Sequence, residues 1–196
     1  MDTKPSESPT APDPRSHFGF TKWPFTSEIA VGKMWRHPGL DELVDDLEAT
    51  VSARFSAAVI APSGTGKSAL LRRLVERLPE TRYRVADVKV TGVGNRDFYR
   101  GLTRALGLTP VGTWPSLLDA SQEYARTLAA TEARRLVMII DEAQDMRPQV
   151  LSTIRMLTNF NLDSELVISL ILVGAAARAR LQWSARFDVQ PTELTS

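Results

Sequence analysis

The sequence contains no cysteine and only two histidines, which are side chains that most protein metal sites depend on. Without cysteine, neither a disulfide framework nor a thiolate metal centre can form. The histidines, His17 and His37, both lie near the N-terminus and lack the spacing of a ligand pair. We therefore interpret both as structural or solvated residues.

Long apolar runs and an excess of charge are also absent. The longest apolar run, Val167 to Ala177, contains Ser169 and falls well short of the roughly 20 residues that cross a bilayer. The N-terminus has no apolar signal core. The net charge is only +1, so a basic binding surface would have to be local. These features predict a cytoplasmic protein without a membrane partner.

A glycine loop between an apolar run and a helical pattern is the most informative stretch. Residues 57–68 read A-A-V-I-A-P-S-G-T-G-K-S. Loop and helix N-terminal N–H groups form a concavity that suits a phosphate, and Gly64 and Gly66 allow its close approach. Lys67 can reach the β- and γ-phosphates, and the Ser68 hydroxyl can ligate Mg²⁺. The residues predicted to bind nucleotide are Ala61, Pro62, Ser63, Gly64, Thr65, Gly66, Lys67, Ser68 and Ala69.

A second apolar run, Leu136 to Ile140, ends in two carboxylates, Asp141 and Glu142. This arrangement suits phosphoryl transfer, because one carboxylate can hold Mg²⁺ and the other can orient or deprotonate a water molecule. The two motifs together predict ATP and Mg²⁺ as ligands. Ser68 and Asp141 are assigned to Mg²⁺, and Lys67 and Glu142 are the predicted catalytic residues.

Strand and helix patterns alternate along the chain. Strands are expected at residues 57–60, 83–90, 136–140 and 166–174, and helices at 38–53, 69–78, 95–106, 116–133 and 148–158. This alternation predicts an α/β fold, a doubly wound parallel sheet with helices on both faces. Ligands bind at the carboxyl ends of the strands in such sheets, where both motifs fall.

Two further segments have two interpretations each. The aromatic stretch His17 to Phe25 should dock on the body of the protein, either as a hydrophobic clasp or as the adenine side of the nucleotide site. Arg96, Arg100 and Arg104 recur every four residues on one predicted helix. They form either a DNA-phosphate contact stripe or a solvated face that pairs with neighbouring acids.

The motifs A-P-S-G-T-G-K-S (Walker A) and L-V-M-I-I-D-E-A-Q (Walker B) resemble those of P-loop AAA+ ATPases. H-F-G-F-T-K-W-P-F-T-S-E-I and L-S-T-I-R-M-L-T-N-F-N-L-D with L-I-L-V-G are similar to the group of ExeA and the transposition helpers TniB, TnsC and MuB. The resemblance covers residues 17–174. It implies a homo-oligomer that assembles on DNA with ATP, recruits or regulates a transposase, and completes each site with a neighbour's arginine.

The chain is predicted to have four parts. They are a disordered tail at 1–16, an aromatic segment and helix docking on the core at 17–56, the P-loop AAA+ core at 57–183, and an irregular tail at 184–196. The sequence departs from the family pattern at Ala61, where a glycine is usual, and at Ala175, where relatives carry a polar residue. It is also expected to stop after the fourth core strand, before a helical lid.

These departures lead us to expect ATP binding with slow or no hydrolysis. Arg178, Arg180 and Arg186 lie in the departing segment, so none is assigned as the catalytic arginine. A DNA transposition helper is the favoured function. The alternatives are an ExeA-type secretion-assembly ATPase, which would be marked by a membrane and peptidoglycan-binding extension, and a nucleotide-binding remnant without turnover.

Overall fold

The computed structural model describes residues 13–21, 23, 29–34, 38–89, 92, 94–158, 167–175 and 191–193. The chain divides into two compact units, Met1–Trp35 and Arg36–Ser196. The aromatic stretch belongs to the first unit and the predicted helix of residues 38–53 to the second. Docking of the aromatic stretch on the core stays a prediction.

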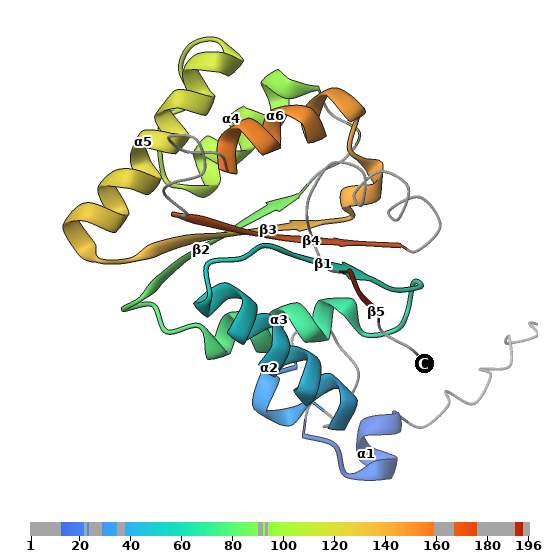
Figure 1. Cartoon of the computed structure of the whole chain (residues 1–196). Helices are drawn as coiled ribbons and strands as arrows, with labels where there is room; N and C mark the ends of the chain where they lie inside the picture. Colours follow the sequence, from blue (N-terminus) through green and yellow to red (C-terminus); the bar gives the residue numbers. More distant parts are fainter. Residues whose placement is uncertain are drawn as a thin grey trace, which may run out of the picture. The chain divides into compact units, whose positions relative to one another are not determined.

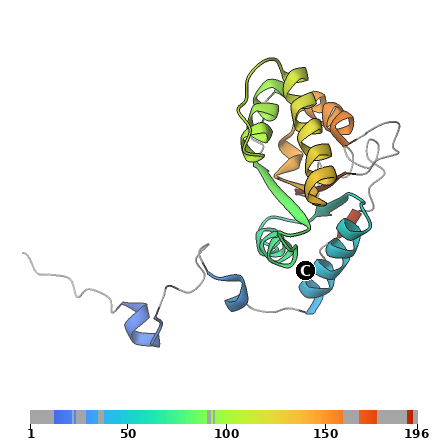
Figure 2. The same ribbon diagram turned by 90° about the vertical axis from the view of Figure 1, so that its left-hand side faces the viewer.

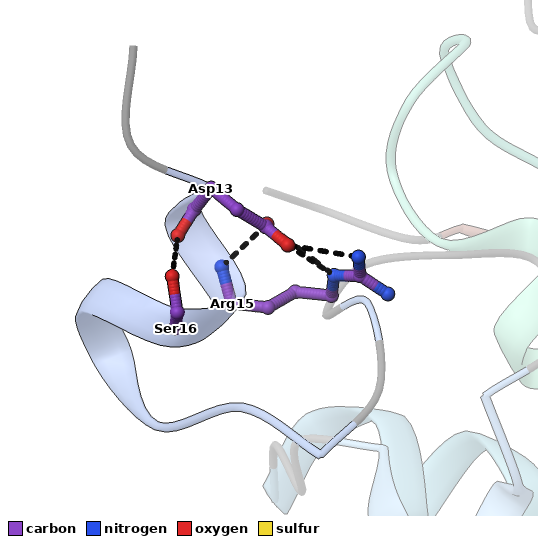
Figure 3. A network of polar contacts seen from close by, with 3 residues as sticks. All are labelled: Asp13, Arg15 and Ser16. Atoms are coloured by element: carbon purple, nitrogen blue, oxygen red, sulfur yellow. Dashed lines mark hydrogen bonds and ion pairs between the residues drawn. The ribbon is translucent and has the colours of Figure 1, made fainter. Parts of the chain in front are cut away.

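The first unit contains a short helix, α1 (Pro14–Phe18), and a 3-10 turn, η1 (Val31–Lys33). Asp13 caps α1, because its side chain accepts a hydrogen bond from the Arg15 N–H at 3.0 Å and forms an ion pair with the Arg15 guanidinium at 2.8 Å (Figure 3). The hydrogen bond from the Arg15 side chain lowers the pKa of the Asp13 carboxyl. Ser16 donates its hydroxyl hydrogen to the Asp13 carbonyl at 2.8 Å.

This cap corrects the predicted disordered tail of residues 1–16. Residues 13–16 are ordered as the cap and first turn of α1, while residues 1–12 lie outside the described part of the chain. The proline-rich composition suggested disorder, but Asp13 is a favourable N-cap and Pro14 a favourable first residue of a helix.

The second unit is built on a parallel sheet. Its strands are β1 (Ala57–Ile60), β2 (Tyr83–Lys89), β3 (Arg135–Asp141), β4 (Ile168–Gly174) and β5 (Pro191–Glu193). They lie in the order β2-β3-β4-β1-β5, and every neighbouring pair is parallel. The predicted doubly wound α/β fold is confirmed.

Helices cover both faces of the sheet (Figure 1). Helices α2 (Pro38–Ser52) and α3 (Lys67–Arg77) lie on one face, and α4 (Asn95–Ala105), α5 (Trp114–Glu132) and α6 (Pro148–Thr158) lie on the other. The view turned by 90° shows the same separation, with the green, yellow and orange helices above the sheet (Figure 2). A 3-10 turn, η2 (Ala143–Asp145), lies between β3 and α6 in the chain.

The two layers of the core follow the alternation of side chains along each strand. In β3, Val137 and Ile139 pack toward α2 and α3, while Leu136, Met138 and Ile140 pack toward α4, α5 and α6. All five are buried, as expected of a central parallel strand covered on both faces.

Ion pairs join α2 to α3. Arg73, whose side chain is nearly buried, lies 2.5 Å from the Asp41 carboxylate. Arg77 pairs with Asp45 and, at 2.6 Å, with Glu48. Three acids of α2 thus face the arginines of the neighbouring helix α3.

Several element boundaries differ from the sequence predictions by one or two residues. Helix α4 begins at Asn95, as predicted, with Gly94 as its N-cap, and the buried Asn95 side-chain oxygen accepts no hydrogen bond from a described residue. Helix α5 begins at Trp114, before the predicted Ser116, because Pro115 is tolerated in a first helical turn. Strand β4 begins at Ile168.

Strand β5 corrects the prediction that the sheet ends after four core strands and that residues 184–196 are irregular. Residues Pro191–Glu193 pair with Ala58–Ile60 of β1 and add a fifth strand at the sheet edge. A three-residue strand is too short to show an alternating pattern, and its proline is compatible only with an edge or strand-start position.

Among the helices of the described ranges, none has the length and apolar character that a membrane crossing needs.

Candidate nucleotide site

The phosphate loop connects β1 to α3. Gly64 and Gly66 have φ values of 85° and 92°, a left-handed conformation that favours glycine, as the sequence predicted. No described atom lies within 4 Å of a Cβ built on either glycine, so the space beside the loop is open. Gly66 caps α3, and the free N–H groups of the first helical turn begin at Lys67. The loop therefore has the form of an anion-binding site.

Lys67 is the first residue of α3 and is 9% exposed. Its ammonium group donates hydrogen bonds to the carbonyl oxygens of Ala61 at 3.1 Å and Pro62 at 2.9 Å. The Pro62 carbonyl also accepts the Thr65 hydroxyl at 2.8 Å. The two bonds of Lys67 hold its ammonium group next to the loop backbone and leave one of its three N–H donors for a ligand.

Asp141 is the last residue of β3 and Glu142 follows it, and the phosphate loop follows β1. Strand β4 runs between them, with Gly174 beside Ile60 and Leu172 beside Ile140. Two strand spacings separate β1 from β3, so the motifs start roughly 10 Å apart at one edge of the sheet. The structure thus brings together the two segments that the sequence assigned to one site.

The oxygen atoms around this edge fit a hard cation such as Mg²⁺. Ser68 is exposed at the start of α3, and Asp141 is half-buried at the end of β3. One Asp141 oxygen accepts the Glu142 N–H at 2.9 Å, and no described residue engages the other. No cluster of three or more histidine or acidic ligands occurs in the described ranges, so phosphate oxygens of a nucleotide and water molecules would supply the remaining ligands of a bound Mg²⁺.

Glu142 is held in an unusual position. Its φ of 52° is left-handed, which is uncommon for a residue with a side chain. Its carboxylate accepts a hydrogen bond from the Gln144 amide nitrogen at 2.5 Å, and the Gln144 amide oxygen accepts the Ala175 N–H at 3.0 Å. Gln144 was not among the predicted site residues, although it belongs to the run D-E-A-Q.

The predicted arginine stripe lies on α4. Arg96 and Arg104 are exposed and Arg100 is half-buried, while Phe98 and Tyr99 are buried on the other side of the helix. None of the three arginines forms an ion pair within the described part of the chain, so the pairing with neighbouring acids is not seen there. Arg178, Arg180 and Arg186 lie outside the described residues.

A family model described as an AAA domain matches residues 51–181, which is more than half of the chain. The chain belongs to this AAA domain family. Membership implies nucleotide binding, and the matched residues include the phosphate loop and Asp141-Glu142.

A curated relative of this AAA chain is the general secretion pathway protein A of Aeromonas hydrophila, 28% identical over 113 residues. The match covers 57% of this chain and 20% of that protein, so the chain spans about a fifth of the relative. The similarity supports the AAA assignment and leaves the finer assignment to a TniB- or TnsC-like group open.

Two solved structures resemble the AAA chain. The ADP form of the Aeropyrum pernix ORC2 protein has a TM-score of 0.60 at 17% identity and covers 92% of this chain and 52% of that one. Cdc6p of Pyrobaculum aerophilum has a TM-score of 0.57 at 20% identity and covers 76% and 41%. At these identities the likeness shows the α/β P-loop fold.

Proposed function

We propose that this AAA chain binds Mg²⁺ and ATP at the edge formed by β1, β4 and β3, and that the bound nucleotide controls its assembly with other copies. The observation that carries the proposal is the convergence of a ready-made phosphate loop and a carboxylate pair on either side of β4. The solved ADP form of a protein with this fold supports an adenine nucleotide as the ligand.

Each residue of the site has a proposed role. The loop N–H groups and Lys67 bind the β- and γ-phosphates, because charge-assisted hydrogen bonds to phosphate are the strong ones. Ser68 and Asp141 would hold Mg²⁺, which neutralises charge on the phosphate oxygens. Glu142 orients the attacking water and accepts its proton.

We expect hydrolysis by the chain alone to be slow. An arginine that meets the charge developing on the transferred phosphoryl group is worth about 10³–10⁵ in rate. Lys67 is the cation that the phosphate loop itself holds, and the arginines after β4 lie outside the described residues. A neighbouring copy is the proposed source of the missing cation, which makes the assembled state the active one.

The favoured setting for this activity is DNA transposition, with DNA and a transposase as partners. The stripe of Arg96, Arg100 and Arg104 supports a DNA role, because its charges form no ion pair with described residues and stand at one-turn intervals on an outer helix. Transposase recruitment rests on the motif resemblance alone.

The similarity to the general secretion pathway protein A favours a second candidate, a secretion-assembly ATPase. In that setting the nucleotide site would act in the same way, but the arginine stripe would not contact DNA. A nucleotide-binding scaffold without turnover is the third candidate, and it shares the binding site but not the role of Glu142.

Steady-state ATP hydrolysis by the purified chain, with and without double-stranded DNA, separates these candidates. The proposal predicts a turnover well below about 1 s⁻¹ for the chain alone, a rise when DNA promotes assembly, and loss of the activity in Glu142→Gln. A turnover of about 1 s⁻¹ or faster without DNA that Glu142→Gln removes contradicts the slow isolated chain. Saturable ATP hydrolysis that never responds to DNA favours the secretion role.

A further inference from the structure

We infer that Gln144 is a positioning residue, whose side-chain amide fixes the carboxylate of Glu142 by tying it to the backbone at the end of β4. This inference rests on the proposed role of Glu142 in water activation. It assigns a function to a residue that neither the phosphate loop nor the carboxylate pair includes.

The contacts determine the orientation of the amide. A carboxylate can only accept hydrogen bonds and a backbone N–H can only donate one. Gln144 meets Glu142 at 2.5 Å and the Ala175 N–H at 3.0 Å, so its nitrogen must face the carboxylate and its oxygen the backbone. A flipped amide would satisfy neither partner, and the bridge therefore holds in one orientation only.

The bridge ends on a well-anchored segment. Ala175 directly follows Gly174, which is paired with Ile60 of β1, and the Gly174 carbonyl accepts the Ala61 N–H at 3.1 Å. Ala61 in turn accepts a hydrogen bond from Lys67. A continuous set of hydrogen bonds thus connects the group that binds phosphate with the group that activates water, through the strand that lies between them.

The bridge also leaves Glu142 able to react. Gln144 occupies one carboxylate oxygen, and no described residue engages the other, which is free to accept a proton from water. The left-handed backbone of Glu142 and the bond from its N–H to Asp141 fix where the side chain starts. Gln144 fixes the position of the Glu142 carboxylate group, so the flexible side chain is restrained at its backbone end and at its carboxylate end.

The functional test is single-turnover hydrolysis of MgATP with the protein in excess, together with the equilibrium affinity for MgATP. Gln144→Ala should lower the single-turnover rate roughly 10- to 100-fold, as expected for a misplaced catalytic group. It should leave the affinity within about 3-fold of the parent, because the Gln144 side chain bonds Glu142 and Ala175 and not the described residues of the phosphate loop. Gln144→Glu should lose as much, because it cannot donate to Glu142. Gln149→Ala, an exposed glutamine of α6, is the matched control and should behave as the parent.

A structural test on the same full chain does not depend on catalysis. In ¹H–¹⁵N spectra of the nucleotide-free protein, Glu142→Ala should shift the Gln144 side-chain amide signals, and Gln144→Ala should shift the Ala175 backbone amide. Gln149→Ala should move neither. Unchanged signals in the first two variants overturn the inference whatever the hydrolysis rates.

Failure of the inference and failure of the proposed function give different results. If Glu142→Gln loses hydrolysis but Gln144→Ala retains the parental rate, the proposed function stands and the positioning role is overturned. If Glu142→Gln retains the parental rate, or the parent hydrolyses no ATP even in the presence of DNA, Glu142 has no step to be positioned for. The inference and the proposed catalytic role of Glu142 then both fall, while MgATP binding is tested separately by titration. Equal losses of affinity and rate in Gln144→Ala indicate a purely structural residue and overturn the inference.

Discussion

The Nζ atom of Lys67 lies 3.1 Å from the carbonyl oxygen of Ala61, the residue at which the chain departs from the usual first glycine of the loop motif. Ala61 does not have a positive φ, and it uses only backbone atoms in its bonds to Lys67 and Gly174. An alanine can form both bonds as well as a glycine. The departure therefore leaves the lysine in its binding position, whereas the later glycines of the loop cannot be exchanged in this way.

Gly66 and Gly101 form a matched pair for testing this difference. Gly66→Ala should cost about 1–2 kcal/mol, because φ is 92° and alanine is strained there, and should weaken MgATP binding as the loop shifts. Gly101→Ala lies within α4 with open space around the new Cβ, and should stabilise the protein by about 0.4–1 kcal/mol. Chemical denaturation measures both values. Equal effects in the two variants would contradict the assigned loop conformation.

Tyr99 should make stability fall at alkaline pH. Burial of its side chain in the core raises the pKa of the phenol from 10.0 to about 12. The folded protein then retains a proton that the unfolded chain releases, so the free energy of unfolding falls as pH rises from about 10 to 12, by up to about 2–3 kcal/mol.

Denaturation of Tyr99→Phe over the same pH range isolates this contribution. The variant should lack the Tyr99 part of the alkaline decline, and the parent should keep it. An unchanged decline in Tyr99→Phe would show that Tyr99 ionises as easily in the folded state as in the unfolded chain.

The arginine stripe on α4 should determine the salt dependence of DNA binding. Each phosphate contact contributes about 0.9 to the slope of log affinity against log salt, so replacing Arg96, Arg100 and Arg104 with alanine should reduce the slope by up to about 2.7. The triple lysine variant keeps the charge and should keep most of the slope. Arg54→Ala, an exposed arginine before β1, is a second control. A slope that the alanine variant leaves unchanged removes the stripe from the DNA site.

Most of the fold could be predicted from strong local patterns in the sequence. Apolar runs such as Leu136–Ile140 predict central strands, and the glycine loop with Lys67 indicates where a phosphate site begins. These signals are local, because they follow from burial on both faces of a sheet and from the backbone freedom of glycine.

Features that depend on contacts between distant segments were not predictable. The bond between Gln144 and Ala175 joins residues that are far apart in the chain, and the pairing of Arg73 with Asp41 depends on how α2 and α3 pack. Strand β5 was not predicted, because three residues are too few to show an alternating pattern. It is defined by its pairing with β1, which is distant in the sequence.

Calorimetric titration of the full chain with ATP, in the presence and absence of Mg²⁺, tests the central claim most directly. The parent should bind MgATP, Asp141→Asn should lose the dependence on Mg²⁺, and Lys67→Ala should lose roughly 100-fold or more in affinity as charge-assisted phosphate contacts disappear. Lys33→Ala, an exposed lysine of the N-terminal unit, should bind as the parent does. A folded Lys67→Ala variant that binds MgATP as tightly as the parent would contradict the placement of the nucleotide between β1 and β3.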